Sequence, residues 1–336
     1  MKRKGYIFEQ IADIDNLRFA FWKAQKGKSQ KKDVAAFRAN LDSNLLQIRN
    51  ELLEGSYRYG DYHYFTIYDP KRRVICAASF AERVLHHAVM NICAIDFDNR
   101  QIPHSYACRK GKGTFAALEQ TAQNQKRFAW YLKLDVRKYF DSISHDLLFE
   151  KLQCIYKDEK LLRLFWHIID SYHASDNCGL PIGNLTSQYF ANHYLSYADR
   201  YATEQLRIPA YVRYMDDMLL WANTREELLE KGREFEKFIS NNLYLSLKPA
   251  VINKAEHGLP ALGFQVFPQQ IRLNKNSCKR FIEKTAEYSR LLQERKIDEK
   301  KFAQNTLSLY GFISHATHSN SFARKIQEQM PEALSV

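Results

Sequence analysis

The sequence predicts an α+β fold, because long segments with helical spacing flank several short apolar runs that are typical of strands. Residues 6–55 place apolar side chains at helical intervals, and the segment from Ser277 to the end is again helical and basic. Residues 130–136 and 211–221 are shorter runs rich in aliphatic and aromatic side chains, which favours strands. No internal repeat or low-complexity tract interrupts this pattern.

Composition restricts the class of partner. The 336 residues are 45% hydrophobic and 26% charged, which supplies a core and allows two or three domains or one compact enzyme. The formal net charge is +12 and the pI is about 9.3. Such an excess predicts a polyanionic partner, with nucleic acid ahead of a membrane surface. The 21 Phe and 20 Tyr residues suit base stacking as well as core packing.

The cysteines and the hydropathy predict a reduced, cytoplasmic protein without a membrane partner. No two cysteines form a Cys-x-x-Cys pair, so the sequence suggests neither a zinc site built on them nor a disulfide framework. No apolar run approaches the length of a membrane span, and residues 1–5 do not resemble a signal peptide. The six cysteines are Cys76, Cys93, Cys108, Cys154, Cys178 and Cys278.

Local signals in the first half of the chain predict a strand or hairpin followed by a capped helix. Residues 57–68 are Tyr-rich and alternate in polarity, as strands do. Ser79 can cap the next helix, and Glu82, three residues on, would complete a capping box. His86 and His87 lie on that helix, where core or surface histidines are more common than metal ligands.

The second half alternates turns, helices and strands. Residues 104–114 are basic and punctuated by glycine, which predicts a turn that opens a helix at Thr114 and a local geometry that favours anions. Residues 130–136 predict a strand that carries an acid at its end. The remaining expected elements are helices at 145–152, 159–173 and 224–241, a loop at 177–188 that runs into a long helix through Asn192 and Arg200, and short strands near 243–247 and 261–273.

Two adjacent carboxylates interrupt the apolar run 211–221. Acids are depleted from strands, and unpaired acids against a core are costly. An isolated Asp-Asp is usually a solvent-exposed turn. Here Asp216 and Asp217 follow Tyr214 and Met215 between two apolar stretches, so a buried hairpin would present both acids, and a bound divalent cation would explain them.

Asp135 offers a second chain segment for a metal site. Two metal ions roughly 4 Å apart can activate an attacking 3′-hydroxyl and stabilise a leaving pyrophosphate, and such a pair needs acids from separate segments. The carbonyl of Val136 is a further candidate oxygen ligand.

Nucleoside triphosphate chemistry also needs cations around the phosphates and a means of choosing the sugar. Lys71, Arg73 and Arg109 are the candidate cations. Phe140, on the turn after Asp135, is a candidate for blocking a ribose 2′-hydroxyl, the alternative being a core aromatic.

Four motifs follow one another along most of the chain. They are His-Ser-Tyr-Ala-Cys-Arg-Lys-Gly-Lys-Gly-Thr at 104–114, Leu-Asp-Val-Arg-Lys-Tyr-Phe at 134–140, Leu-Pro-Ile-Gly-Asn-Leu-Thr-Ser-Gln at 180–188 followed by Phe-Ala-Asn at 190–192, and Arg-Tyr-Met-Asp-Asp at 213–217. In this order they resemble reverse transcriptases, and more closely those of diversity-generating retroelements, within the bacterial superfamily that includes group II intron and retron enzymes. The segment 181–188 is the most specific of the four.

The resemblance implies a right-hand polymerase fold. An N-terminal helical extension and the fingers would occupy residues 1–130, and the palm, an antiparallel sheet backed by helices, residues 131–265. Residues of about 145–180 would return toward the fingers, and a helical thumb would span 266–336. This division leaves no room for an appended RNase H or endonuclease domain.

The resemblance also assigns roles to individual residues. Asp135 and Asp216 would bind two catalytic Mg²⁺ ions, for which Mn²⁺ can substitute, and Asp217 would be the third acid. The other implied roles are nucleotide contacts by Lys71, Arg73, Arg109, Phe140, Ile182, Gly183 and Gln188, and primer or template contacts by Tyr214, Met215, Leu262, Gly263 and Phe264.

Two positions depart from the family pattern. Most reverse transcriptases have Gln where this chain has Ile182, and an isoleucine can pack but cannot hydrogen-bond, so discrimination against mispairs should weaken. Retroelements of this kind are known for errors at template adenines, which fits Ile182. The lysine expected near 245–251 as a general acid is not clearly placed, and Lys248 and Lys254 both stay open.

The resemblance finally implies substrates and partners. They are dNTPs, a template-repeat RNA copied into adenine-mutagenised cDNA, a cDNA primer, and a small basic accessory protein that forms a ring, all in a bacterial or phage-encoded system. The alternatives are a retron, group II intron or phage-defence reverse transcriptase, and the chain ends without the endonuclease tail of the intron version. A catalytically inactive RNA-binding scaffold predicts loss of the acids, whereas all three are present.

Overall fold

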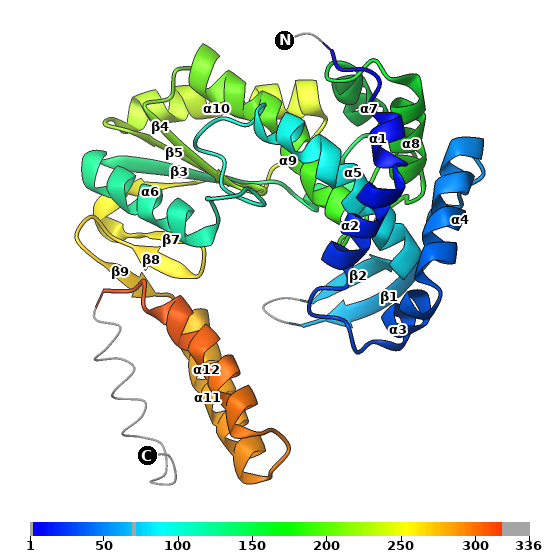
Figure 1. Cartoon of the computed structure of the whole chain (residues 1–336). Coiled ribbons are helices and arrows are strands. Elements are labelled where there is room, and N and C mark those ends of the chain that lie inside the picture. The colour runs from blue at the N-terminus through cyan, green and yellow to red at the C-terminus, as the bar shows by residue number, and fades with distance from the viewer. Residues whose placement is uncertain (1–2, 69–71, 318–336) are drawn as a thin grey trace.

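The computed structural model describes residues 3–68 and 72–317, in which helices and antiparallel strands form an α+β fold. In Figure 1, helices α5 and α9 run between two sides of the molecule: the N-terminal helices with α7 and α8, and a sheet with α6 and α10. The helices are α1 (Phe8–Ile11), α2 (Ile14–Ala24), α3 (Lys32–Ala39), α4 (Leu41–Glu54), α5 (Phe80–Asp98), α6 (Thr114–Arg127), α7 (His145–Gln153), α8 (Glu159–Asp170), α9 (Leu185–Arg200), α10 (Arg225–Leu243), α11 (Lys275–Gln293) and α12 (Glu299–Ile313).

A sheet of four antiparallel strands, counted over the described residues, has the order β4-β5-β3-β6. Strand β3 (Trp130–Asp135) coincides with the strand predicted at 130–136. Strands β4 (Ala210–Tyr214) and β5 (Asp217–Ala222) form the predicted hairpin, and β6 (Val251–Lys254) lies on the other side of β3. The central strand β3 therefore ends on an acid beside the tip of the hairpin.

Both faces of this sheet are covered, which explains why its strands are nearly continuous apolar runs. Leu132 belongs to the same buried cluster as Phe235 of α10. Tyr131 and Trp221 belong to a second cluster on the side of α6. Because side chains alternate along a strand, Asp135 lies on the same face as Tyr131. The acid therefore extends the row of side chains that faces α6.

Helix α5 begins as predicted, but its capping box is only half formed. The Ser79 hydroxyl accepts a hydrogen bond from the Glu82 amide at 3.3 Å. The Glu82 carboxylate, however, accepts from the amide of Gly60 at 3.2 Å, while the Ser79 amide donates to the carbonyl of Asp61 at 3.0 Å. Gly60 and Asp61 supply these partners, so the segment that contains them lies against the start of the helix. His86 is a fully buried core histidine, as predicted, and burial lowers its pKa to about 3.

Two predicted strands are shorter than expected. The strand or hairpin expected at 57–68 is the single strand β1 (Tyr62–Ile67), which pairs with β2 (Arg73–Ala78) in an antiparallel ribbon. The strand expected at 261–273 is divided into β7 (Leu259–Ala261), β8 (Phe264–Val266) and β9 (Ile271–Leu273), which form a small antiparallel sheet.

The strand predicted at 243–247 is wrong. Helix α10 continues through Leu243, and Tyr244 ends it in the left-handed conformation with φ 53°. The buried residues Leu243 and Leu245 pack in the main core from this helix end and loop, so their apolar character does not indicate a strand. Leu247 forms an isolated antiparallel bridge with Val136, and strand pairing resumes at Val251.

The predicted C-terminal helical region is a hairpin of α11 and α12 that projects from the small sheet (Figure 1). Asn274 caps α11 by accepting from the amide of Ser277 at 2.8 Å, so the helix begins slightly before the predicted start. All six cysteines are free thiols. Among the described residues, no helix combines the length and apolarity needed to cross a membrane.

Candidate active site

The β4–β5 hairpin carries the Asp-Asp pair at its tip. Tyr214 pairs with Asp217 across the hairpin, so the loop consists of Met215 and Asp216. Met215 has φ 54°, a region that residues with a side chain enter at a steric cost. Two-residue loops accept this cost because positive φ matches the twist of the flanking strands. The loop therefore holds Asp216 at the end of the sheet.

Strand register brings the third acid to this tip. Asp135 is the cross-strand partner of Asp217, and directly opposed residues have Cβ atoms about 4.5–5.5 Å apart. Burial raises the pKa of Asp216, and the charges of Asp135 and Asp217 raise it further. Like charges this close are destabilising, so the cluster favours a cation. The structure thus gathers the three acids that the sequence singled out.

Two lysines partly neutralise these acids. Lys248 Nζ lies 2.6 Å from Oδ1 of Asp135, and Lys133 Nζ lies 3.1 Å from Oδ1 of Asp217. Both carboxylate oxygens are buried, yet neither accepts a hydrogen bond of good geometry from the described residues. The two lysine–carboxylate contacts are therefore ion pairs that lack the geometry of a hydrogen bond. Buried carboxylate oxygens that accept no directional hydrogen bond suit a hard divalent cation, so the donor set fits Mg²⁺ or Mn²⁺.

The structure distinguishes between the two lysines that the sequence leaves open as candidate general acids. The Lys248 amide donates to the carbonyl of Asp135 at 2.8 Å, which fixes this residue beside the acids. Lys254 pairs with Trp130 at the opposite end of β3, and its ammonium lies 3.4 Å from the Glu256 carboxylate. Of the two, Lys248 is the one at the acid cluster.

Removing the charge of Lys248 should make the acid cluster harder to ionise. Lys248 lowers the pKa of Asp216, although burial and the other two acids outweigh it. In Lys248→Met we expect the pH of half-maximal Mn²⁺ binding to move upward, because metal ligation requires deprotonated carboxylates. Mn²⁺ titrations followed by electron paramagnetic resonance measure this midpoint. An unchanged midpoint, or an equal shift in the matched variant Lys254→Met, would contradict the expectation.

A buried ion pair lies directly behind the hairpin loop. Arg213 and Asp199 are both fully buried, and the guanidinium makes two bonds of 2.7 Å to the carboxylate, from Nε to Oδ1 and from Nη2 to Oδ2. Nη1 of the same guanidinium donates to the Met215 carbonyl and to Oδ1 of Asn192, both at 3.0 Å. The Tyr211 hydroxyl donates to Asp199 at 2.8 Å. Sequence reasoning missed this network, which ties the loop to helix α9.

The segment around Ile182 packs along the edge of β2. The Cys76 amide donates to the Ile182 carbonyl at 2.8 Å. Gly183 follows with φ 123°, and a Cβ there would lie 2.8 Å from Cγ2 of Ile75 and 3.2 Å from the Cys76 carbonyl oxygen. A glycine is therefore required at this position. The Ile182 side chain is half-buried.

Phe140 adjoins the same segment. It lies in a short 3-10 helix (Tyr139–Ser142) after β3, and its carbonyl accepts from the Leu180 amide at 2.8 Å. Its ring packs edge-on against Tyr139 and is half-buried against the main core. A half-buried ring serves core packing with one part and leaves the other part exposed.

Arg109, which the sequence predicts as a triphosphate contact, is hydrogen-bonded within its own turn. Its Nε donates to Oδ1 of Asp98 at 2.6 Å, and Nη1 donates to the carbonyls of Ile102 and Ser105 at 2.7 and 2.8 Å. The guanidinium is largely buried by these contacts. It holds together the turn that precedes α6, where backbone carbonyls would otherwise lack partners.

The other predicted nucleotide and primer residues differ in exposure. Arg73 is exposed at the first residue of β2, and Lys71 lies outside the described residues. Gln188 is half-buried in the first turn of α9. The Tyr214 hydroxyl is hydrogen-bonded to the Thr114 hydroxyl at 2.9 Å, which connects the hairpin to the start of α6.

The turn between β7 and β8 contains the last predicted primer contacts. Ala261 pairs with Phe264, so Leu262 and Gly263 form a two-residue loop with φ 54° and 90°. Phe264 is fully buried and its ring lies 4.8 Å from that of Phe312. The Phe264 side chain therefore packs in the core beside this small sheet, and a primer contact by this residue stays a prediction. Leu262 and Gly263 are half-buried, and Leu262 packs against the clusters that contain Trp221 and Phe264.

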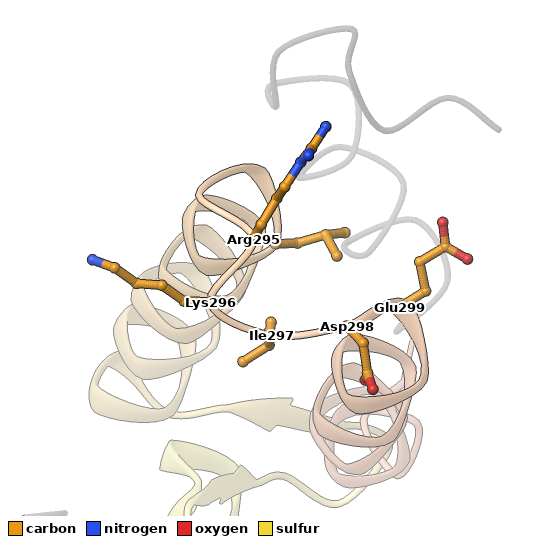
Figure 2. Close-up of a pocket in the computed structure, with 6 residues that line it drawn as sticks. Arg295, Lys296, Ile297, Asp298 and Glu299 are labelled. Carbon is orange, nitrogen blue, oxygen red and sulfur yellow. The ribbon is translucent and has the colours of Figure 1, made fainter.

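A separate pocket lies at the turn between α11 and α12 (Figure 2). It is at the end of the helical hairpin that projects away from the sheets (Figure 1). Ligand sites usually combine an apolar cavity with convergent polar groups, and here the charged side chains of the turn point in different directions. We therefore take the acid cluster as the candidate active site. The pocket is lined by Leu292, Arg295, Lys296, Ile297, Asp298 and Glu299.

Three carboxylates gathered from two chain segments, beside two lysines, form a site of the kind used in metal-dependent phosphoryl transfer. Residues 69–266 match the family described as reverse transcriptase (RNA-dependent DNA polymerase). The match covers more than half of the chain and includes all three acids. The chain therefore belongs to the reverse transcriptase family.

Curated relatives match parts of the chain at low identity. The putative COX1/OXI3 intron 1 protein of Saccharomyces cerevisiae is 22% identical over 173 residues, which is 49% of this chain and 21% of the relative. Nuclear intron maturase 1, mitochondrial, of Arabidopsis thaliana is 26% identical over 149 residues, 38% of this chain and 21% of the relative. Protein YkfC of Escherichia coli is 25% identical over 184 residues, 50% of this chain and 47% of the relative. The chain thus spans less than half the length of each.

Proposed function

We propose that this protein is an RNA-directed DNA polymerase that acts by two-metal-ion nucleotidyl transfer. The observation that carries the proposal is the cross-strand pairing of Asp135 with Asp217 beside Asp216, with buried carboxylate oxygens that lack hydrogen bonds from the described residues. Two Mg²⁺ ions, or Mn²⁺ in their place, would activate the primer 3′-hydroxyl and stabilise the leaving pyrophosphate. The three carboxylates would hold these ions, with the Val136 carbonyl as a further ligand.

The proposed division of the chain is an N-terminal helical extension and fingers at 1–130, palm at 131–265 and thumb at 266–336. Helices α7 and α8 lie on the side of the N-terminal helices, which supports a return of residues 145–180 toward the fingers (Figure 1). The Lys4 amide donates to the Ile155 carbonyl at 2.9 Å, consistent with that return. The projecting α11–α12 hairpin suits a thumb that grips a duplex.

Selection of deoxynucleotides is assigned to Phe140. The carbonyl of this residue is bonded to Leu180, so its backbone is held beside the segment that contains Ile182 and Gly183, and its ring packs edge-on against Tyr139. A ring held in this way can exclude a ribose 2′-hydroxyl by contact. Arg73 is the exposed cation we assign to the triphosphate, together with Lys71.

We further propose that the enzyme is the error-prone polymerase of a diversity-generating retroelement, working on template-repeat RNA in a bacterial or phage-encoded cytoplasmic system. The support is Ile182, whose carbonyl is bonded to β2 and whose side chain is half-buried without a polar atom. A small basic accessory protein of the retroelement would be a partner. The names of the curated relatives support a second candidate, an intron-encoded reverse transcriptase.

Ile182→Gln is expected to raise fidelity opposite template adenine. A glutamine can hydrogen-bond around the nucleotide and template pair, so the correct pair gains a contact that a mispair lacks. Sequencing of cDNA made by both proteins from one RNA template measures the error spectrum. The matched variant Ile182→Leu keeps an apolar side chain and should keep the errors. An identical spectrum in Ile182→Gln and wild type would remove Ile182 from the explanation.

Primer extension on an RNA template with dNTPs and Mg²⁺, with and without the accessory protein, tests the function as a whole. DNA synthesis with errors mainly opposite adenine would support the retroelement enzyme. Accurate DNA synthesis would keep the polymerase and favour the intron, retron or defence candidates. RNA binding without synthesis in any combination would favour an inactive scaffold.

A further inference from the structure

A second cluster of metal-ligating side chains lies outside the acid site. His145 is the first residue of α7, Asp170 is the last residue of α8, and His173 follows α8. One ligand atom from each of the three lies within 4.8 Å of the other two. The His173 Nε2 and Asp170 Oδ1 atoms are 3.3 Å apart. Ligands at roughly 2.0–2.2 Å from a tetrahedral metal are themselves about 3.4 Å apart. Asp170 and His173 already have this spacing, and a bound ion would draw the His145 ligand atom in from a distance of at most 4.8 Å.

The hydrogen bonding of His145 leaves one nitrogen ready to coordinate. The ring is fully buried, and Nε2 lies 2.7 Å from the Gly179 carbonyl oxygen. A carbonyl can only accept, so Nε2 carries the hydrogen and Nδ1 of the neutral ring has a free lone pair. Nδ1 is buried and has no hydrogen-bond partner among the described residues. A buried acceptor without a partner is costly, and a metal ion would satisfy it.

Such an arrangement is common in protein metal sites. A metal-ligating histidine almost always donates its other ring N–H to a carbonyl or carboxylate, which fixes the ring orientation. Burial lowers the pKa of His145, so the imidazole stays neutral, as metal ligation requires. His173 and Asp170 are each about half exposed, with side-chain exposures of 46% and 47%, so an ion can enter from solvent.

We propose that His145, Asp170 and His173 form a site for a divalent transition metal, with Zn²⁺ as the fitting ion and water as the fourth ligand. Two imidazoles and one carboxylate suit Zn²⁺ or Co²⁺ and do not suit Mg²⁺, which prefers oxygen ligands alone. The site is distinct from the acid cluster and does not depend on the polymerase activity.

The site would clamp together the two chain segments that contain Phe140 and Ile182, which are both predicted nucleotide contacts. The Gly179 amide donates to the Ile143 carbonyl at 2.9 Å, and the Leu180 amide donates to the Phe140 carbonyl at 2.8 Å. A metal on His145 and His173 would join the same two segments through side chains. Its role is therefore structural: it would fix the loop that leads into residues 180–184.

Co²⁺ and Zn²⁺ titrations of the tag-free full chain test the proposal. Millimolar Mg²⁺ in the buffer competes with Co²⁺ and Zn²⁺ for the carboxylate site. We expect one equivalent of Co²⁺ to bind, with the strong visible absorption of a tetrahedral site, and Zn²⁺ to displace it. We also expect Zn²⁺ at a hundredfold excess over its dissociation constant to raise the melting temperature by roughly 3–5 °C.

Two exposed ligands allow variants that should fold normally. Asp170→Asn and His173→Ala should each weaken Zn²⁺ binding by at least about tenfold and remove the gain in melting temperature. His257→Ala is the matched control, because His257 is also an exposed histidine beside a carboxylate, 3.8 Å from Glu256. Two results would overturn the proposal: no stoichiometric binding of Co²⁺ or Zn²⁺, or equal binding in the two ligand variants and the control. Asp170 and His173 would then form an ordinary surface ion pair.

Discussion

Asp216→Asn is expected to reduce DNA synthesis by roughly 10³-fold or more, since a metal-ion centre contributes several kcal/mol of transition-state stabilisation. Asp216 occupies the two-residue loop beside Asp135 and Asp217, so an amide there would replace one of the three proposed metal ligands with a weaker, uncharged one. Primer extension under single-turnover conditions measures the loss. Glu230→Gln on α10 is the matched control, because it removes one exposed negative charge without touching the site.

The same variant should not destabilise the metal-free protein. Burial and the two neighbouring acids raise the pKa of Asp216, so the folded state binds its proton more tightly than the unfolded state does. The contribution of this carboxyl to stability is therefore present at low pH and is lost as the pH rises through its folded pKa. The asparagine side chain of the variant has no such proton to lose. We therefore expect the melting temperature of Asp216→Asn to increase relative to that of wild type as the pH rises. Measurements in EDTA across this range would refute the electrostatic argument if wild type became the more stable protein at neutral pH.

Arg213→Met is expected to destabilise the fold by about 3–5 kcal/mol, because it leaves the Asp199 carboxylate buried without its partner. It also removes the donor to the Met215 carbonyl, which holds the loop before Asp216. We expect the remaining folded protein to be about 10²-fold slower, the cost of a displacement of about 1 Å in a catalytic group. Urea unfolding and single-turnover synthesis measure the two effects separately.

A double variant distinguishes the two roles of this ion pair. Replacing both partners, as Arg213→Met with Asp199→Leu, removes both buried charges and should recover most of the lost stability. Activity should stay low, because the Met215 carbonyl still lacks its donor. If the double variant recovered both stability and activity, the ion pair would act through stability alone. Arg18→Met is the matched control: Arg18 and Asp42 also pair at 2.7 Å but are exposed, so the change should cost less than about 1 kcal/mol.

Features decided by neighbouring residues could be predicted from the sequence. The Ser79 cap depends on a hydroxyl three residues before the Glu82 amide, and the acid hairpin depends on the two-residue loop at Met215 and Asp216. The strand ending at Asp135 also followed from its apolar run. In each case the relevant partner lies within a few residues, so the pattern of side chains contains the information.

Features that depend on distant partners were missed or wrong. Arg109 is a basic residue in a basic, glycine-containing segment, which favours a phosphate contact. Its guanidinium, however, is hydrogen-bonded to Asp98 and to two backbone carbonyls. The apolar residues near Leu245 fill the core from a loop, which a pattern of burial alone cannot distinguish from a strand.

The sequence by itself determined the α+β class, the acids and the hairpin that presents two of them. Only the tertiary structure decided that Asp135 stands opposite Asp217, that Lys248 rather than Lys254 reaches the acids, and how the side chain of Arg213 is satisfied. The physical reason is that helix and strand periodicity is a property of adjacent residues, whereas the partner of a buried charge is chosen by whichever segments the core brings into contact. Register and packing are therefore what convert separate acidic residues into one site.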